Sequence, residues 1–201
     1  MTTQLLTRRK HSPRSGQPLI GELELKKGRL HECCGSARHL FALLMIAQSE
    51  GPVIWISPSW MPDALNPDGM VGLVDPARFI FVSPQRPEDI LWTLEEVLRS
   101  GIVTLAVADI PGMPGLTQVR RLHLAAETGG VEGNLLPTGL LLTPGDGGAQ
   151  GVESRWKLSP AHKPAEDGWQ LKRLRARTEP VAEWHVKQNA GAFSLMGQTT
   201  G

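Results

Sequence analysis

The sequence predicts an α/β domain of three layers, in which helices cover both faces of a mostly parallel central sheet and antiparallel strands extend its C-terminal edge. Three observations support this prediction. Short apolar runs of strand length alternate with helical segments between residues 28 and 128. A glycine turn joins the first of these strands to the first helix. After residue 151, the strands contain alternating polar and apolar residues, which is typical of an antiparallel sheet.

The size and charge of the chain limit the classes of function. The chain has 201 residues and a formal net charge of +1, so we expect one core and no global attraction to nucleic acid or membranes. No apolar run reaches the roughly 20 residues that span a bilayer. The N-terminus lacks the apolar segment of a secretory signal, and we therefore expect a cytoplasmic protein.

Residues 1–18 carry several basic side chains, among them Arg8, Arg9, Lys10 and Arg14. Their composition predicts a flexible basic arm. Two interpretations stay open for this arm, namely a solvated tail and a contact with DNA or with the acidic surface of a partner.

The first predicted strand and helix enclose a short turn. Residues 28–34 predict a buried strand, and residues 37–49 predict a helix that is apolar nearly all round. Gly35 and Ser36 lie between them. Strand, glycine turn and helix N-terminus in this order form the architecture of a phosphate-binding P-loop.

The chemistry of a P-loop is missing at this turn. A P-loop needs a second glycine followed by Lys and then Ser or Thr, whereas this chain has Leu40, Phe41 and Ala42. No side chain at the required spacing neutralises the phosphates or holds Mg²⁺. The sequence therefore predicts a degenerate P-loop, in which Arg38 and His39 are the residues that could neutralise an anion.

Two more buried strands are expected at residues 53–56 and 79–82. The clearest helix follows at Pro87, with two acidic residues, Glu88 and Asp89, at its positive N-terminal end. Gly101 is its predicted end.

An apolar strand over residues 102–110 contains Asp109 near its end. This is the form of a Walker B strand, in which the aspartate reaches Mg²⁺. Many parallel strands, however, end in an aspartate that caps the next loop. Because no P-loop lysine would hold a nucleotide nearby, the structural interpretation of Asp109 is favoured.

The parallel core is expected to continue to about residue 136. We predict a helix over residues 116–128 that Gly129 and Gly130 terminate, and a short strand at residues 134–136. Residues 137–151 are rich in Gly and Pro, and we expect a mobile loop there.

The antiparallel edge is expected over residues 152–187, and residues 188–201 are expected to form a disordered tail. This edge contains the densest positive cluster of the chain, made of Lys172, Arg173, Arg175 and Arg177. The cluster is either a solvated strand edge or a docking surface for an acidic partner or a DNA backbone.

Several segments resemble those of one known family. Gly-Arg-Leu-x-Glu at residues 28–32 resembles the opening of the RecA-type ATPase core, and more closely that of the ImuA-like proteins, which are shortened RecA relatives. Residues 120–127 are very similar to the "RRL-x-LAAE" segment of ImuA-like proteins. The tryptophan-bearing strands after residue 153 look like the C-terminal half of these proteins. The resemblance covers about residues 20–187 and implies a RecA-like three-layer domain over residues 19–187.

The resemblance also implies a function. It implies a non-catalytic adaptor in SOS-induced translesion DNA synthesis and mutagenesis, which contacts ImuB, an error-prone DNA polymerase and RecA. A RecA-type ATPase has an acidic residue after its second strand, whereas this chain has no carboxylate between residue 53 and Asp63. RecA-type proteins grip DNA with loops near residues 137–151, but this chain has no basic residue between Arg121 and Arg155, which argues against a direct contact. We therefore expect no catalytic residue, cofactor or metal.

Two alternatives to the adaptor remain open. One is a cell-division inhibitor of the SulA type, which would bind FtsZ. The other is an unorthodox RecA-like ATPase, in which Arg38 would grip the phosphates. The long C-terminal strand region favours the adaptor over the SulA type.

Overall fold

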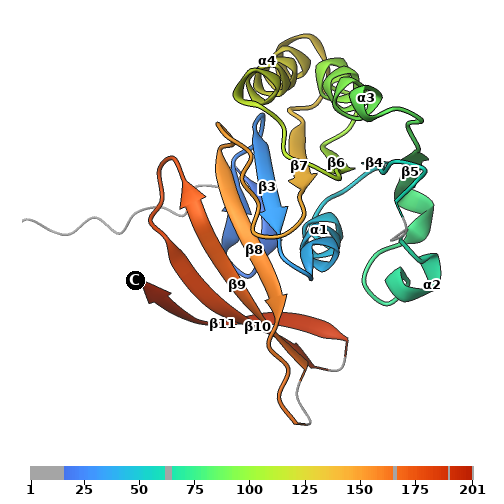
Figure 1. Cartoon of the computed structure of the whole chain (residues 1–201). Coiled ribbons are helices and arrows are strands. Elements are labelled where there is room, and N and C mark those ends of the chain that lie inside the picture. The colour runs from blue at the N-terminus through green and yellow to red at the C-terminus, as the bar shows by residue number, and fades with distance from the viewer. Residues whose placement is uncertain (1–15, 62–64, 165–166, 190, 201) are drawn as a thin grey trace, which may run out of the picture.

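A computed structural model describes residues 16–61, 65–164, 167–189 and 191–200 of the chain. Its centre is a nine-stranded sheet (Figure 1). From one edge to the other, the strands are β11 (Ala192–Thr200), β10 (Ala182–Asn189), β9 (Asp167–Ala176), β8 (Ser154–Pro160), β3 (Leu30–Cys34), β7 (Thr138–Leu142), β6 (Leu105–Asp109), β4 (Val53–Ile56) and β5 (Phe79–Val82).

The sheet is parallel on one side and antiparallel on the other. All neighbouring strands from β8 to β5 are parallel, whereas β8, β9, β10 and β11 pair with one another in antiparallel fashion. This confirms the predicted α/β class with a mostly parallel sheet and antiparallel C-terminal strands. One detail differs, because β8 belongs to both parts: it is parallel to β3 and antiparallel to β9.

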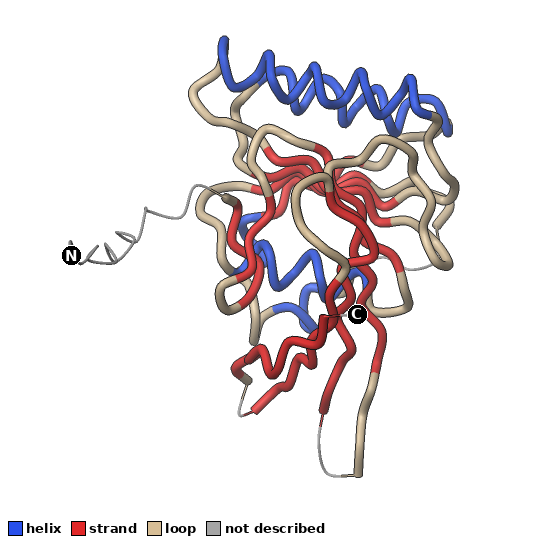
Figure 2. Tube along the Cα trace, turned by 90° about the vertical axis from the view of Figure 1, so that its left-hand side faces the viewer, coloured by secondary structure: helices blue, strands red, loops and turns tan. Residues whose placement is uncertain are grey.

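Two layers cover the sheet (Figure 2). Helices α3 (Pro87–Ser100) and α4 (Leu116–Glu132) pack on one face. Helix α1 (Arg38–Ala47) packs on the other face, together with a hairpin of β1 (Gln17–Ile20) and β2 (Leu23–Leu25). Two short helical pieces, α2 (Pro67–Met70) and η1 (Pro76–Arg78), connect β4 to β5. The arrangement is consistent with a RecA-like three-layer fold.

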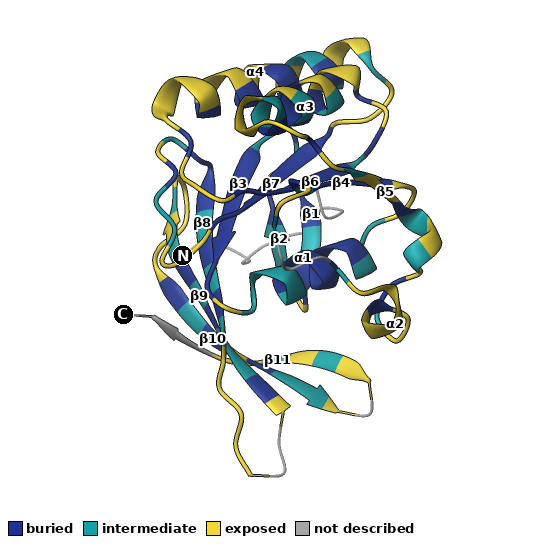
Figure 3. Cartoon of the chain, turned by 45° about the vertical axis from the view of Figure 1, so that its right-hand side comes forward, coloured by how far each residue is buried: buried dark blue, intermediate teal, exposed yellow. Residues whose placement is uncertain are grey.

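The helices form where the local sequence predicts them. Helix α3 has Pro87 in its first turn, two acidic residues beside it, and Gly101 in the left-handed conformation (φ +58°) after its last residue. Helix α1 buries six consecutive apolar residues, from Phe41 to Ile46, in the core that it forms with the sheet and the β1–β2 hairpin. Figure 3 shows that buried residues concentrate in the parallel strands, while the outer sides of α3 and α4 are largely exposed. None of the described helices is long and apolar enough to cross a membrane.

The two ends of the chain differ from the expectation. Most of the predicted basic arm, residues 1–15, lies outside the described residues, and β1 already begins at Gln17. The expectation of a disordered tail over residues 188–201 is wrong, because β11 pairs with β10 over most of this length. The physical reason is that Phe193 and Leu195 are two positions apart in the strand, which places both side chains on one face, against the core on the α1 side.

The expectation of a mobile loop over residues 137–151 is wrong for its first part. Residues 138–142 form β7, which is fully buried between β3 and β6. The short strand expected at residues 134–136 does not form. The helix before it continues past Gly129 to Glu132, because Gly129 allows close packing against α3 rather than ending the helix.

Candidate functional site

The turn that resembles a P-loop connects β3 to α1. Gly35 has a φ of +90°, and a Cβ atom at this position would lie 2.4 Å from the carbonyl oxygen of Leu158. The amide of Gly35 donates to the carbonyl of Gly145 (3.1 Å), and the amide of Ala37 donates to that of Leu158 (3.1 Å). In a P-loop, such amides point at a phosphate. Here both amides bond to carbonyl groups of the chain itself.

The structure brings Arg38 and Asp109 together. Asp109 ends β6 and is buried, and its carboxylate accepts hydrogen bonds from Nε of Arg38 (3.4 Å) and from Nε2 of His39 (2.5 Å). Ser36, which belongs to the same turn, is exposed. The positive charge that the sequence offers for an anion is thus directed at a carboxylate of the protein.

A second buried carboxylate, Glu32 in β3, was not among the predicted site residues. Its Oε2 accepts from Nε of Arg155 (2.5 Å). Its Oε1 accepts from Oγ1 of Thr143 (2.8 Å) and from the amides of Gly148 (2.8 Å) and Ala149 (3.1 Å). These bonds attach the segment after β7 to the centre of the sheet.

An acidic residue in the middle of a buried strand was the signal that could have revealed this role. A buried charge needs a counter-ion or hydrogen bonds. A glutamate within Leu30–Cys34 therefore predicts a buried cation or several hydrogen-bond donors beside it. The partner Arg155 lies 123 residues away in sequence, so the sequence alone does not identify it.

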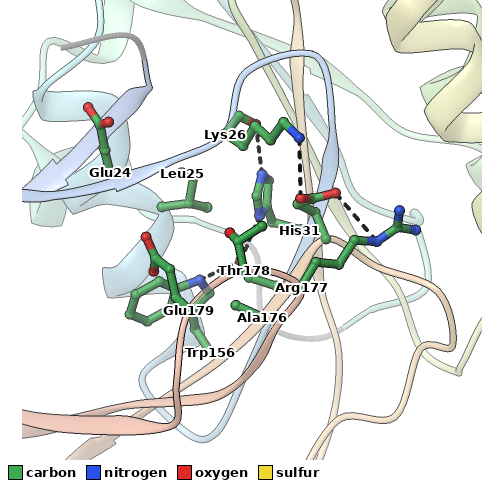
Figure 4. Close-up of a pocket in the computed structure, with 11 residues that line it drawn as sticks. Glu24, Leu25, Lys26, His31, Trp156, Ala176, Arg177, Thr178 and Glu179 are labelled. Carbon is green, nitrogen blue, oxygen red and sulfur yellow. Dashed lines mark hydrogen bonds and ion pairs between the residues drawn. The ribbon is translucent and has the colours of Figure 1, made fainter. Parts of the chain in front are cut away.

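A small cavity lies between β2, β3, β8 and the turn after β9 (Figure 4). On its wall, Nε2 of His31 donates to the carbonyl of Lys26 (2.9 Å), and Nδ1 of His31 accepts from the hydroxyl of Ser154 (2.7 Å). The Ser154 oxygen in turn accepts from Nε1 of Trp156 (2.8 Å). Burial of the imidazole lowers the pKa of His31 to about 4. The histidine is therefore neutral at physiological pH.

Glu153 lines the same cavity and is also buried. Three cations surround its carboxylate: Lys26 at 3.7 Å, Arg29 at 3.8 Å and Arg177 at 3.5 Å. The cavity has a volume of about 40 Å³, which is enough for water and too small for a nucleotide. This polar cluster ties the N-terminal hairpin to the C-terminal strands.

The predicted positive cluster on β9 is dispersed by the fold. The Arg173 guanidinium lies over the rings of both Trp156 (5.4 Å) and Trp184 (5.3 Å), which stack on each other, and it donates to the carbonyl of Pro180 (2.9 Å). Lys172 pairs with Glu183 (3.1 Å) on the other face of the sheet, and Arg177 pairs with Glu153 as stated above. Arg175 is exposed, and it alone of the four has no ion-pair partner within the described part of the chain. The four side chains do not form one continuous positive patch.

No protein-family model matches this chain. The chain is similar to Protein ImuA of Caulobacter vibrioides strain NA1000, with 31% identity over 92% of this chain and 84% of that protein. The same values hold for Protein ImuA of Caulobacter vibrioides strain CB 15. At this identity and coverage, the chain belongs to the ImuA family.

Proposed function

We propose that this protein is a non-catalytic adaptor in damage-induced mutagenesis. Membership of the ImuA family supports the link to this process. In finer terms, the adaptor would act in SOS-induced translesion DNA synthesis through contacts with an ImuB-like protein, an error-prone DNA polymerase and RecA.

The observation that best supports the non-catalytic part is the ion pair between Arg38 and Asp109. Arg38 lies in the turn that corresponds to a P-loop, and Asp109 lies at the end of the strand that resembles a Walker B strand. Because Asp109 is buried and its carboxylate already accepts from Arg38 and His39, it is poorly placed to bind a metal ion. The amides of Gly35 and Ala37 support the same conclusion, because they already donate to carbonyl groups of the chain.

The fold supplies surfaces on which an adaptor can act. Several large apolar side chains are exposed on the α3 and α4 side, among them Trp92 and Leu124. Exposed apolar groups that lie close together often mark protein contacts. Direct binding to DNA is less favoured, because the basic side chains in and just after β9 are mostly paired with carboxylates or packed over tryptophan rings.

Deletion and complementation in the native bacterium test this function. Deletion of the gene is expected to abolish the rise in mutation frequency after ultraviolet irradiation, and the wild-type gene is expected to restore it. The purified tagged protein is expected to retain the ImuB-like protein and RecA. An unchanged mutation frequency in the deletion strain would contradict the proposal.

A variant that lacks both charges of the Arg38–Asp109 pair distinguishes the adaptor function from an ATPase activity. The double variant Arg38→Gln with Asp109→Asn removes both charges of the pair, and a folded adaptor is expected to keep complementing the deletion. Loss of complementation by this variant, with its circular dichroism spectrum unchanged, would favour catalysis. Overproduction is expected to leave cell length unchanged, whereas filamentous cells would favour the FtsZ-binding alternative.

A further inference from the structure

Helices α3 and α4 are in close contact at their C-terminal ends. A Cβ atom at Gly129 would lie 2.0 Å from the carbonyl oxygen of Leu98, and one at Gly101 would lie 2.2 Å from that of Gly129. Only glycine permits this approach. Between the N-terminal halves of the same helices, larger side chains leave a groove open on the surface.

The groove consists of two adjoining pockets of about 230 Å³ and 200 Å³. Leu91 and Gln118 line both pockets, so the two pockets lie side by side. The first pocket includes Trp92, and the second includes Met113 from the loop after β6. Both side chains are strongly exposed, Trp92 to 59% and Met113 to 45%. The groove thus combines an apolar lining with access from solvent.

Three charged residues line the groove, and only one of them lacks an ion-pair partner. Glu95 lies at the bottom, where it pairs with Arg121 from α4 (2.7 Å). This pair links the two helices, and the same Glu95 carboxylate also pairs with Arg99 of α3. Glu88 is exposed at the open end, one helical turn before Trp92, and no ion pair involves it within the described residues. The unpaired charge of the groove is therefore negative.

We propose that this groove binds a protein segment that combines bulky apolar residues with lysine or arginine. A cationic side chain would lie over the ring of Trp92 and pair with Glu88, while an apolar residue would enter the pocket beside Met113. An acidic segment or a nucleic acid would place like charge against Glu88. The inference rests on the adaptor function proposed above and identifies the surface through which it acts.

Site-specific photo-crosslinking identifies the protein segment that binds in the groove. We would replace Trp92 by p-benzoyl-phenylalanine in the full-length protein, irradiate damaged cells, and identify the attached segment by mass spectrometry. A control with the same group at Val131, which lies at the far end of α4 and is 85% exposed, reports nonspecific contact. The expected product is one protein segment with Lys or Arg next to bulky apolar residues, attached at position 92 and not at position 131. No adduct at position 92, an acidic segment, or equal labelling at both positions would overturn the proposal.

Binding of that segment as a synthetic peptide then tests whether Glu88 and Trp92 contribute to the affinity. Glu88→Lys and Trp92→Ala are each expected to weaken the affinity at least tenfold, and Glu132→Lys on the exposed end of α4 is expected to leave it unchanged. All three positions are exposed, and thermal unfolding verifies that the variants fold. Unchanged affinity in both groove variants would contradict the proposal.

The mutagenesis assay distinguishes failure of the groove from failure of the adaptor function. If the gene is required for mutagenesis but the folded Glu88→Lys and Trp92→Ala variants complement fully, the groove proposal is wrong and the adaptor function stands. If deletion itself leaves mutagenesis unchanged, the adaptor function is wrong.

Discussion

Nε of Arg38, the first residue of α1, lies 3.4 Å from Oδ1 of Asp109, the last residue of β6. Within the same cluster, His39 donates to the other carboxylate oxygen of Asp109. These contacts join the start of the first helix to the carboxyl end of a central strand, where open α/β sheets usually bind their ligands. The cluster therefore connects the start of α1 to the carboxyl end of β6.

Asp109→Asn is expected to destabilise the protein by about 2 to 3 kcal/mol. The change leaves Arg38 without its counter-ion, and removal of one partner from a buried ion pair costs about 3–5 kcal/mol when both groups are fully buried. The cost is lower here because 16% of the Arg38 side chain and 23% of the His39 side chain are exposed. Urea unfolding at pH 7 measures the change. If the Arg38→Gln, Asp109→Asn double variant lost as much stability as the two single variants together, or more, the pairing would be disproved.

Glu32→Gln is expected to loosen the segment after β7. The change removes the charge that holds Arg155 and weakens the acceptor of the Gly148 and Ala149 amides. We expect hydrogen exchange at these two amides to accelerate at least tenfold. The exposed Glu132→Gln serves as the control. Equal exchange rates in both variants would show that Glu32 does not anchor the segment.

Stability is expected to fall in mildly acidic solution because of His31. The pKa of this group is about 4 in the folded state and 6.5 in the unfolded state, since burial disfavours the charged form. Above pH 6.5, both states hold the neutral ring. As the pH falls toward 4, only the unfolded state takes up the proton, which lowers the free energy of unfolding by about 2 kcal/mol at pH 5.

The variant His31→Gln isolates this effect. It is expected to be less stable than the wild type at pH 7, because the bonds to Lys26 and Ser154 change, but to lose about 2 kcal/mol less between pH 7 and pH 5. Urea unfolding of both proteins at both pH values measures the loss of stability in each. The contribution of other titrating groups cancels when one loss is subtracted from the other. An identical loss in both proteins would contradict the assignment of this pH dependence to His31.

Arg173→Ala is expected to cost about 2 kcal/mol of stability. The change removes cation–π contacts with two tryptophans, each worth roughly 0.5–1 kcal/mol or more when desolvated, and a hydrogen bond to Pro180. Arg175→Ala, two residues away on the same strand and exposed, is expected to change the stability by less than about 0.5 kcal/mol. Equal effects in thermal unfolding would mean that both arginines are surface groups.

The parallel core could be predicted because each strand contains its own signal. Residues 53–56 and 105–108 are continuous apolar runs, and the chain between them contains clear helix boundaries. β7 was missed because Pro137 and Gly139 are typical of loops. Gly139 is needed in the sheet, where a Cβ atom would lie 2.7 Å from the side chain of Leu30.

The site residues could be predicted in part. The absence of a lysine at the P-loop position depends only on the spacing of residues, so the sequence alone was sufficient to predict it. The partners of the charges were not predictable, because Glu32 and Arg155 meet only when β8 pairs with β3. For the same reason, the arginines of β9 looked like one cluster in sequence, although strand alternation and two tryptophans separate Arg173 from its neighbours.

Nucleotide binding tests the central claim most directly. Isothermal titration of the full-length protein with ATP and Mg²⁺, together with the Arg38→Ala variant, compares the proposed adaptor with an ATPase. We predict no saturable heat and no phosphate release with either protein. Saturable binding by the wild type that Arg38→Ala abolishes would contradict the account.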